Sequence, residues 1–96
     1  IRRLQEYGIE PIVTDPWASE KEAFNEYGIE LVTLDSMQEL DCIIVAVAHD
    51  QYCEIDKLRL KEMYRIPSDE NKVILDVKGI YNVNEMKQLG FKCWRL

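Results

Sequence analysis

Short apolar runs alternate with amphipathic stretches along the whole chain. Residues 42–48 (CIIVAVA) are apolar at both odd and even positions, and residues 73–77 (VILDV) nearly so. A strand has this pattern when both of its faces are buried, as in the centre of a parallel sheet. The first run is therefore expected to be a central strand. Further short strands are expected at residues 12–14, 31–34 and 91–96.

The segments between these strands have helical character. Ser19 can cap one helix and Asp50 another, because short polar side chains accept hydrogen bonds from the first free amides of a helix. Residues 66–71 (IPSDEN) have the composition of a loop. Helices are expected at residues 1–8, 19–27, 35–40, 50–64 and 83–89.

Two stretches share the letters EYGIE, at residues 6–15 (EYGIEPIVTD) and 26–35 (EYGIELVTLD). Residues 87–96 (KQLGFKCWRL) keep the same order of helix end, glycine and incoming strand with different letters. The intervening lengths are unequal, which favours one recurring helix-to-strand joint over a solenoid repeat. Each glycine is expected to end its helix in the left-handed conformation.

Alternation of helices and strands predicts an α/β domain with a mostly parallel sheet. The chain has 96 residues, enough for one small domain. It begins with Ile1 rather than Met, inside an expected helix. We therefore interpret residues 1–96 as a single truncated domain of a longer protein.

Composition narrows the function classes. The net charge of −6 argues against nucleic acid as a general partner, because phosphate backbones require clustered Lys and Arg. The longest apolar run is far shorter than the roughly 20 residues that cross a bilayer, so no membrane association is expected. Three cysteines without paired spacing give neither a disulfide framework nor a metal site. A reducing, cytoplasmic compartment is the simplest interpretation.

Ligands of parallel α/β sheets bind beyond the carboxyl ends of the strands. This rule selects Asp15, Asp35, His49 and the segment 76–79 (DVKG). Lys78 offers a compact positive charge suited to phosphate, and Gly79 lets the backbone approach a ligand. A solvated lysine beside a turn glycine is the alternative, and the sequence leaves both open.

The other candidates favour structural roles. His49, the single histidine, is expected to pack at a strand end, since no Ser or Cys nucleophile can be paired with it. Trp17 is expected to be half-buried in a loop. Cys42 and Cys93 are expected to be buried and inert, and Cys53 to be structural. The four glycines form neither GxGxxG nor GxxxxGK, so no complete nucleotide loop is present.

Four stretches taken together resemble one family: VTDPWAS (13–19), DCIIVAVAHDQY (41–52), VILDVKGIY (73–81) and GFKCWRL (90–96). They are similar to the carboxy-terminal domain of the UDP-glucose/GDP-mannose dehydrogenases, the nucleotide-sugar 6-dehydrogenases. The forms AVAHD and DVKGIY resemble the branch that acts on UDP-N-acetylhexosamines in capsule and Vi-polysaccharide synthesis. The resemblance implies a three-layer, Rossmann-like α/β domain whose first strand is missing from this fragment.

The resemblance also implies roles. The family oxidises a UDP-sugar primary alcohol to a carboxylate with NAD, which is bound mainly by an absent amino-terminal domain. It works as a homodimer through a central region that carries the catalytic Cys. No residue here matches that Cys, so no catalytic, cofactor or metal residue is assigned. Lys78 and Gly79 are the expected UDP-sugar-binding residues, with Asp76 and His49 as secondary candidates.

One alternative of another class stays open from the sequence. The acids Asp15 and Asp35, each at an expected strand end, suit a non-enzymatic binding module or a receiver-like regulatory domain. The sequence does not identify the sugar, the pathway, the oligomeric state or whether the fragment binds UDP by itself.

Overall fold

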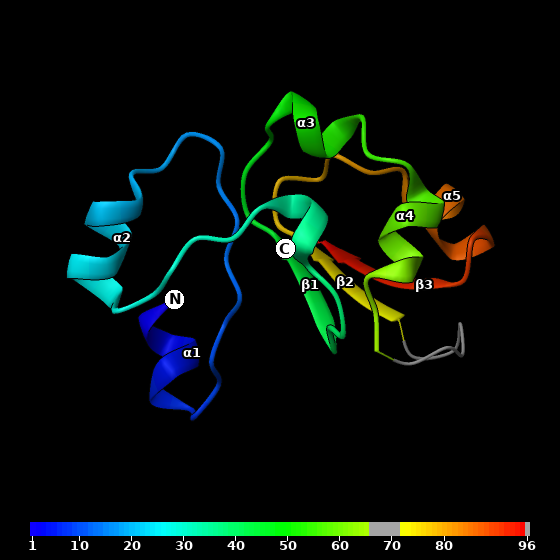
Figure 1. Cartoon of the computed structure of the whole chain (residues 1–96). Coiled ribbons are helices and arrows are strands. Elements are labelled where there is room, and N and C mark those ends of the chain that lie inside the picture. Colours follow the sequence, from blue (N-terminus) through cyan, green and yellow to red (C-terminus); the bar gives the residue numbers. More distant parts are fainter. Residues whose placement is uncertain (66–71, 96) are drawn as a thin grey trace. The chain divides into compact units, whose positions relative to one another are not determined.

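The computed structural model describes residues 1–65 and 72–95, which form two compact units, Ile1–Met37 and Gln38–Leu96 (Figure 1). Each unit is described by itself. The loop expected at residues 66–71 lies outside the described residues, as does Leu96 at the end of the last expected strand.

The first unit contains two short helices and a single strand-like contact. Its helices are α1 (Arg2–Glu6) and α2 (Glu20–Tyr27), followed by the 3-10 turn η1 (Leu34–Ser36). The expectation of strands at residues 12–14 and 31–34 is wrong, because these segments form only one parallel bridge, Val13 to Leu31. A lone pair of short strands is marginal without a third strand beside it.

The ends of α2 confirm the expected signals. The Ser19 hydroxyl accepts the amide hydrogen of Glu22 at 3.3 Å. Gly28 ends the helix with φ of +68° and donates its N–H to the Phe24 carbonyl. A residue with a Cβ would be strained in that conformation. The first helix ends at Glu6, two residues earlier than expected; Tyr7 is its cap residue, and Gly8 follows with φ of +81°.

The second unit is built on a three-stranded parallel sheet, which confirms the predicted α/β class. Its strands are β1 (Cys42–Val45), β2 (Lys72–Asp76) and β3 (Phe91–Arg95), in the order β1-β2-β3. Within this sheet β2 is central and β1 lies at the edge. A strand is present in the expected run 42–48, but it lies at the edge of this sheet and not at its centre. It is also shorter than expected, because it ends at Val45.

The expected helix at residues 50–64 is wrong, because the chain forms two helices there, α3 (Asp50–Cys53) and α4 (Lys57–Glu62). Asp56 separates them, and its carboxylate accepts the amide hydrogen of Leu58 at 2.9 Å. An aspartate in this cap position starts a new helix more readily than it continues an old one. Asp50 also differs from expectation, since the cap residue of α3 is His49.

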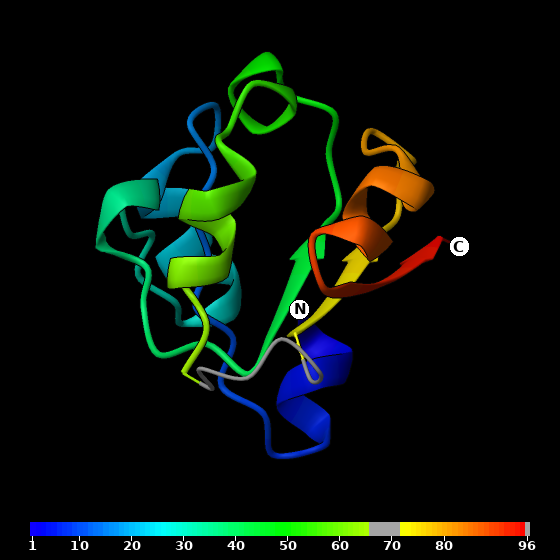
Figure 2. The same cartoon turned by 90° about the vertical axis from the view of Figure 1, so that its right-hand side faces the viewer.

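The last helix, α5 (Val83–Gln88), begins at the cap residue Asn82, whose side chain accepts from the Glu85 amide at 3.0 Å. It ends one residue earlier than expected, and Gly90 follows with φ of +97°. Both α4 and α5 lie on the same face of the sheet (Figures 1 and 2). This placement gives the second unit one helix-covered face.

The core lies between these helices and the sheet. Along β2, buried and half-buried residues alternate, and Ile74 is completely buried. Met86 of α5 is also fully buried, and Phe91 of β3 is 3% exposed. On the opposite face, Ile44 and Trp94 are 46% and 62% exposed, so no helix of this unit covers them. Among the described residues, no helix is long and apolar enough to traverse a bilayer.

Substituting Met86→Ala removes a fully buried side chain from between α5 and the sheet. We expect the free energy of unfolding to fall by about 2–5 kcal/mol, since a cavity replaces the lost contacts. Urea titration followed by circular dichroism measures this. The exposed neighbour Lys87→Ala is the control and should change stability by less than about 0.5 kcal/mol. Equal effects of the two substitutions would contradict the assigned core.

Candidate functional site

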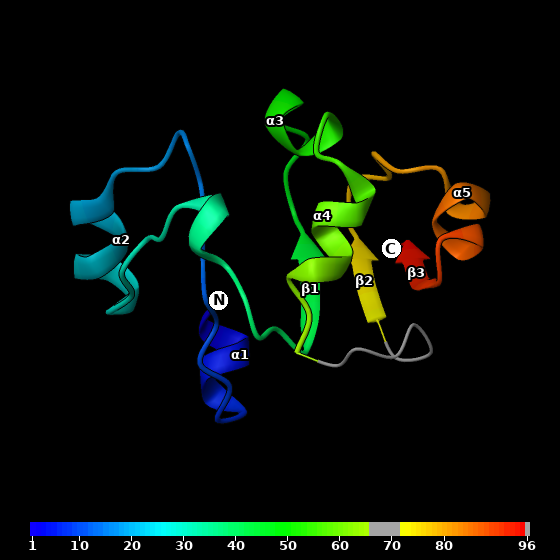
Figure 3. The same ribbon diagram turned by 45° about the vertical axis from the view of Figure 1, so that its right-hand side comes forward.

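The carboxyl ends of the strands in the second unit all point to one edge of the sheet. Figure 3 shows the arrowheads of β1 and β2 directed toward the end where α3 and the segment after β2 lie. Ligand sites of parallel sheets are found at this edge. The second unit therefore places His49 and the segment 76–79 where chemistry is expected.

A tight turn follows β2 and is fixed by Asp76. The amide of Gly79 donates to the Asp76 carbonyl at 3.3 Å, and Gly79 has φ of +68°. The Asp76 carboxylate then accepts two backbone amides, those of Ile80 at 3.1 Å and Tyr81 at 2.9 Å. Asp76 is 0% exposed, and a buried carboxyl group is tolerated because these donors replace water.

Tyr81 connects the turn to the helices. Its hydroxyl donates to the Tyr52 carbonyl at 2.7 Å, and the side-chain nitrogen of Lys57 lies 4.8 Å from its ring centroid. Burial raises the pKa of Tyr81, and the Asp76 charge raises it further. The neutral phenol is therefore strongly favoured, and it acts as a hydrogen-bond donor inside the fold.

The turn leaves Lys78 and Gly79 exposed to solvent, between the buried Asp76 and the buried Tyr81. An ammonium group on a rigid turn at a strand end can attract a phosphate without first ordering its own backbone. This geometry suits the role expected of Lys78 and Gly79. Asp76 supports the turn from inside and is not available to a ligand.

His49 lies at the same edge and is linked to the turn through Tyr52. The two rings meet edge to face, with centroids 5.6 Å apart. The His49 carbonyl accepts the Tyr52 amide at 2.9 Å, which starts α3. This is the packing role expected for His49, a ring that orders the following helix.

The other strand-end candidates lie in the first unit. The Asp15 carboxylate accepts the Trp17 amide at 2.9 Å, which stabilises the local turn. Trp17 is 81% exposed, so the expectation of half-burial is wrong: its loop ahead of α2 leaves most of the side chain in solvent. Asp35 belongs to η1. The expectation that Asp15 and Asp35 share an edge with Lys78 joins two separately described units and stays a prediction.

The three cysteines are free thiols. Cys42 is exposed, not buried as expected, because it lies on the face of edge strand β1 that no helix of this unit covers. Cys53 is exposed as well, and Cys93 is partly buried. Burial raises the pKa of Cys93, with Asp76 adding to the effect. The reactive thiolate of Cys93 is therefore disfavoured.

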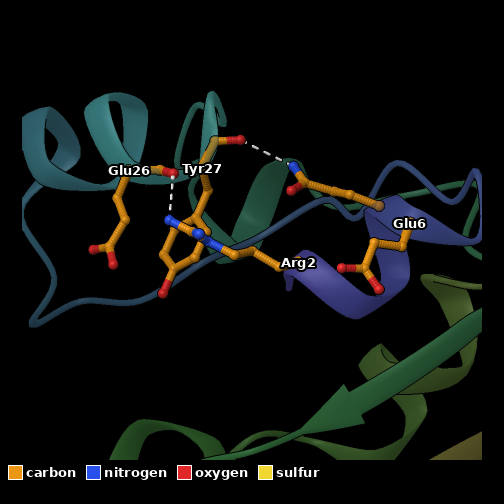
Figure 4. A pocket seen from close by; sticks show the side chains of 5 residues that line it. Arg2, Glu6, Glu26 and Tyr27 are labelled. Carbon is orange, nitrogen blue, oxygen red and sulfur yellow. Dashed lines mark hydrogen bonds between the residues drawn. The ribbon is translucent and has the colours of Figure 1, made fainter.

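One open pocket of about 420 Å³ lies in the first unit (Figure 4). Two of its side chains bond across the helices: the Arg2 guanidinium donates to the Glu26 carbonyl at 3.4 Å, and the Gln5 amide to the Tyr27 carbonyl at 2.9 Å. These bonds satisfy backbone carbonyls at the end of α2, so the residues around the pocket hold α1 against α2. Among the described residues, no three His, Cys, Asp or Glu side chains gather as a metal site.

Sequence analysis missed two residues that anchor the turn: Tyr81, which follows it, and Arg95, at the end of β3. The Arg95 guanidinium donates to the Tyr81 carbonyl at 2.7 Å, across 14 positions of sequence. The rule of strand ends, applied to the last strand as to the others, would have selected Arg95. Tyr81 is the last residue of the stretch VILDVKGIY, but the sequence does not indicate its partners, which come from α3 and β3.

Comparison with known proteins agrees with the geometry. The sequence profile of the UDP-glucose/GDP-mannose dehydrogenase family, UDP binding domain, matches residues 1–83. This chain belongs to that family. The match includes the whole turn from Asp76 to Tyr81 and ends before Arg95. It confirms the resemblance drawn from the sequence and sets aside the receiver-like alternative.

Of three relatives, two are named dehydrogenases and one is named CapL. CapL of Staphylococcus aureus is 30% identical over 96 residues, all of this chain and 21% of that protein. A UDP-N-acetyl-D-mannosamine dehydrogenase of Methanococcus vannielii is 34% identical over 96% of the chain and 20% of its own length. A UDP-N-acetyl-D-glucosamine 6-dehydrogenase of Pseudomonas aeruginosa is 46% identical over 54% of the chain and 12% of its own.

The chain thus spans about one fifth of the length of CapL and of the Methanococcus enzyme. No significant match to a solved structure was found. The family's UDP binding domain, and not the complete dehydrogenase, is what these residues represent.

Replacing Asp76 by Asn places an amide nitrogen among backbone N–H groups that need an acceptor. We expect Asp76→Asn to lower the free energy of unfolding by about 1–3 kcal/mol, because a buried donor is left unpaired. Urea titration measures the loss, with the exposed Glu54→Gln as control. A loss no larger than that of the control would show that Asp76 does not hold the turn.

Alkaline pH should destabilise the fold through its buried tyrosines. Burial raises the pKa of Tyr64 and Tyr81 in the folded state. Their contribution is complete below the unfolded pKa of about 10 and is lost as pH rises above it, by about 1.4 kcal/mol per pH unit for each tyrosine. Urea titrations between pH 8 and 11 measure the slope.

In this series Tyr81→Phe should lower stability at pH 8 and make the alkaline slope shallower, because one buried phenol is gone. Tyr7→Phe, at a position 76% exposed, is the control and should keep the original slope. An unchanged slope in Tyr81→Phe would contradict the buried, neutral phenol.

Proposed function

We propose that this chain is the carboxy-terminal, substrate-nucleotide-binding domain of a larger NAD-dependent UDP-sugar 6-dehydrogenase. The match to the family's UDP binding domain carries the proposal. The names of the relatives support a UDP-N-acetylhexosamine substrate and a role in the supply of polysaccharide precursors. By itself the chain is expected to be inactive, since none of its cysteines corresponds to the family's catalytic Cys.

The proposed reaction converts a primary alcohol of the sugar into a carboxylate. It removes four electrons, which reduce two NAD, and takes one oxygen atom from water. The residues of this chain bind and orient the nucleotide end of the substrate, away from the carbon that reacts. Binding energy gained at a remote part of a substrate holds the reacting group in place.

Within the domain, Lys78 is proposed to contact the phosphates of the nucleotide sugar. Three observations support this role: the residue is exposed, it follows the central strand β2, and its turn is held by the buried Asp76. The neighbouring Gly79 has no side chain, so a ligand can approach the backbone of the turn closely. A charged hydrogen bond to phosphate is among the stronger polar contacts in proteins.

The residues present do not form an NAD site. Dinucleotide binding to a Rossmann turn needs glycines at the spacing GxGxxG, and the four glycines of this chain are isolated. We therefore assign NAD to another part of the proposed enzyme. The central and amino-terminal domains of the same chain are the proposed neighbours, with dimerisation through the central region. Reducing conditions keep thiols free, so the three free cysteines support a cytoplasmic location.

In the full-length enzyme, Lys78→Ala should raise KM for the nucleotide sugar roughly 10- to 100-fold, which corresponds to the loss of one charged hydrogen bond. The change in kcat should be much smaller, because Lys78 acts on the nucleotide and not on the reacting carbon. Steady-state kinetics with the UDP-sugar as the varied substrate measures both values.

Lys92→Ala is the matched control, since Lys92 is an exposed lysine on β3 away from the turn. It should leave KM unchanged, and Lys78→Arg should retain most of the affinity. An unaltered KM in Lys78→Ala would remove the proposed contact.

A further inference from the structure

Arg95 lies at the carboxyl end of β3, directly beside the turn that carries Lys78. In the parallel register Arg95 pairs with Asp76, so the two residues end adjacent strands at the same level. Arg95 lies beyond residues 1–83, which the family profile matches. It therefore has no role assigned by that comparison.

The guanidinium of Arg95 makes two close contacts with the turn. Its Nη2 donates to the Tyr81 carbonyl at 2.7 Å. Its Nε and Cζ lie 3.6 and 3.7 Å from the position that a Cβ on Gly79 would occupy. The planar group thus rests against the open side of Gly79 and reaches over to the backbone of Tyr81.

Asp76 and Arg95, which carry opposite charges, each form a hydrogen bond with the backbone of Tyr81. The carboxylate of Asp76 accepts the amide hydrogen of Tyr81, and the guanidinium of Arg95 donates to the carbonyl oxygen of Tyr81. Both backbone groups of Tyr81 are therefore bound by side chains from neighbouring strands. Hydrogen bonds with an ionic partner are stronger than neutral ones, and two of them from different strands restrict the turn between them.

Lys78 and Gly79 are part of that restricted segment. A lysine side chain is long and flexible, so the position of its ammonium group depends strongly on a fixed backbone. A turn that is already ordered before the ligand arrives loses less conformational entropy on binding. The contacts of Arg95 bear on the part of the turn that Asp76 does not reach, the exposed side of Gly79.

We propose that Arg95 is a positioning residue for Lys78: it closes the turn from the β3 side and so holds Lys78 ready for the phosphates of the nucleotide sugar. This inference rests on the proposed function, because it needs Lys78 to contact the substrate. It adds a residue from outside the matched family region and a mechanism by which that residue acts through another.

A double-mutant cycle in the full-length enzyme tests the proposal. Arg95→Ala alone should raise KM for the nucleotide sugar about 2- to 10-fold, the equivalent of one hydrogen bond, with little change in kcat. In the Lys78→Ala background the same substitution should have no further effect, because a residue that acts through Lys78 has nothing left to position. Arg95→Lys keeps the charge but not the planar fork, and should show an intermediate KM.

Lys92→Ala, on the same strand, should leave KM unchanged, and thermal melts of each variant show whether it is folded. If Arg95→Ala does not fold, the cycle is run with Arg95→Lys. If the KM increases caused by the Lys78 and Arg95 substitutions instead multiply in the double variant, Arg95 binds the substrate directly, and the proposed positioning role is wrong. If KM is unchanged in the Arg95 variants but raised in Lys78→Ala, the role of Arg95 is wrong, while the proposed contact of Lys78 stands. If Lys78→Ala itself leaves KM unchanged, both the proposed contact and the inference fall.

Discussion

A carboxyl group that is removed from water must find hydrogen-bond donors, and Asp76 finds them in the backbone that follows it. The residue ends the central strand of the sheet and is completely buried. Its two acceptor bonds bend the chain back over the strand end, to Ile80 and Tyr81. The exposed turn and the anchoring of the Tyr81 backbone both follow from this one requirement.

The helices of the second unit are arranged around the same point. Asp56 caps the start of α4, which brings Lys57 over the ring of Tyr81. The shorter α3 places the Tyr52 carbonyl where the Tyr81 hydroxyl donates to it. A continuous helix over residues 50–64 would present these groups in a different direction. The break is thus tied to the site and is not an irregularity of packing.

The groups at the end of the central strand differ in exposure and in charge. The turn offers a basic group on an ordered backbone, while the partly buried Cys93 is held in its unreactive form. The carboxylate of Asp76 is enclosed, and Lys78 and Gly79 are the exposed residues of the turn. In the proposed function, this domain contributes affinity and orientation for the nucleotide, and electron transfer is assigned to another part of the enzyme.

The sequence by itself determined the α/β class, the caps at Ser19 and Gly28, and the place of Lys78 at a strand end. These features depend on local patterns: hydrophobic period, capping residues and the order of strand and turn. It did not determine that two expected strands reduce to the Val13–Leu31 bridge, since strand pairing depends on neighbours that are distant in sequence.

Only the tertiary structure decided how the turn is held. Tyr81 meets the Tyr52 carbonyl across 29 positions and the Arg95 side chain across 14. Such contacts leave no periodic signal, because each partner is an ordinary residue in its own segment. The sequence therefore identified the exposed lysine that is proposed to bind the ligand, and the fold identified the residues that hold its turn. The physical reason is that exposure at a strand end is a local property, whereas anchoring a turn requires side chains from three separate elements.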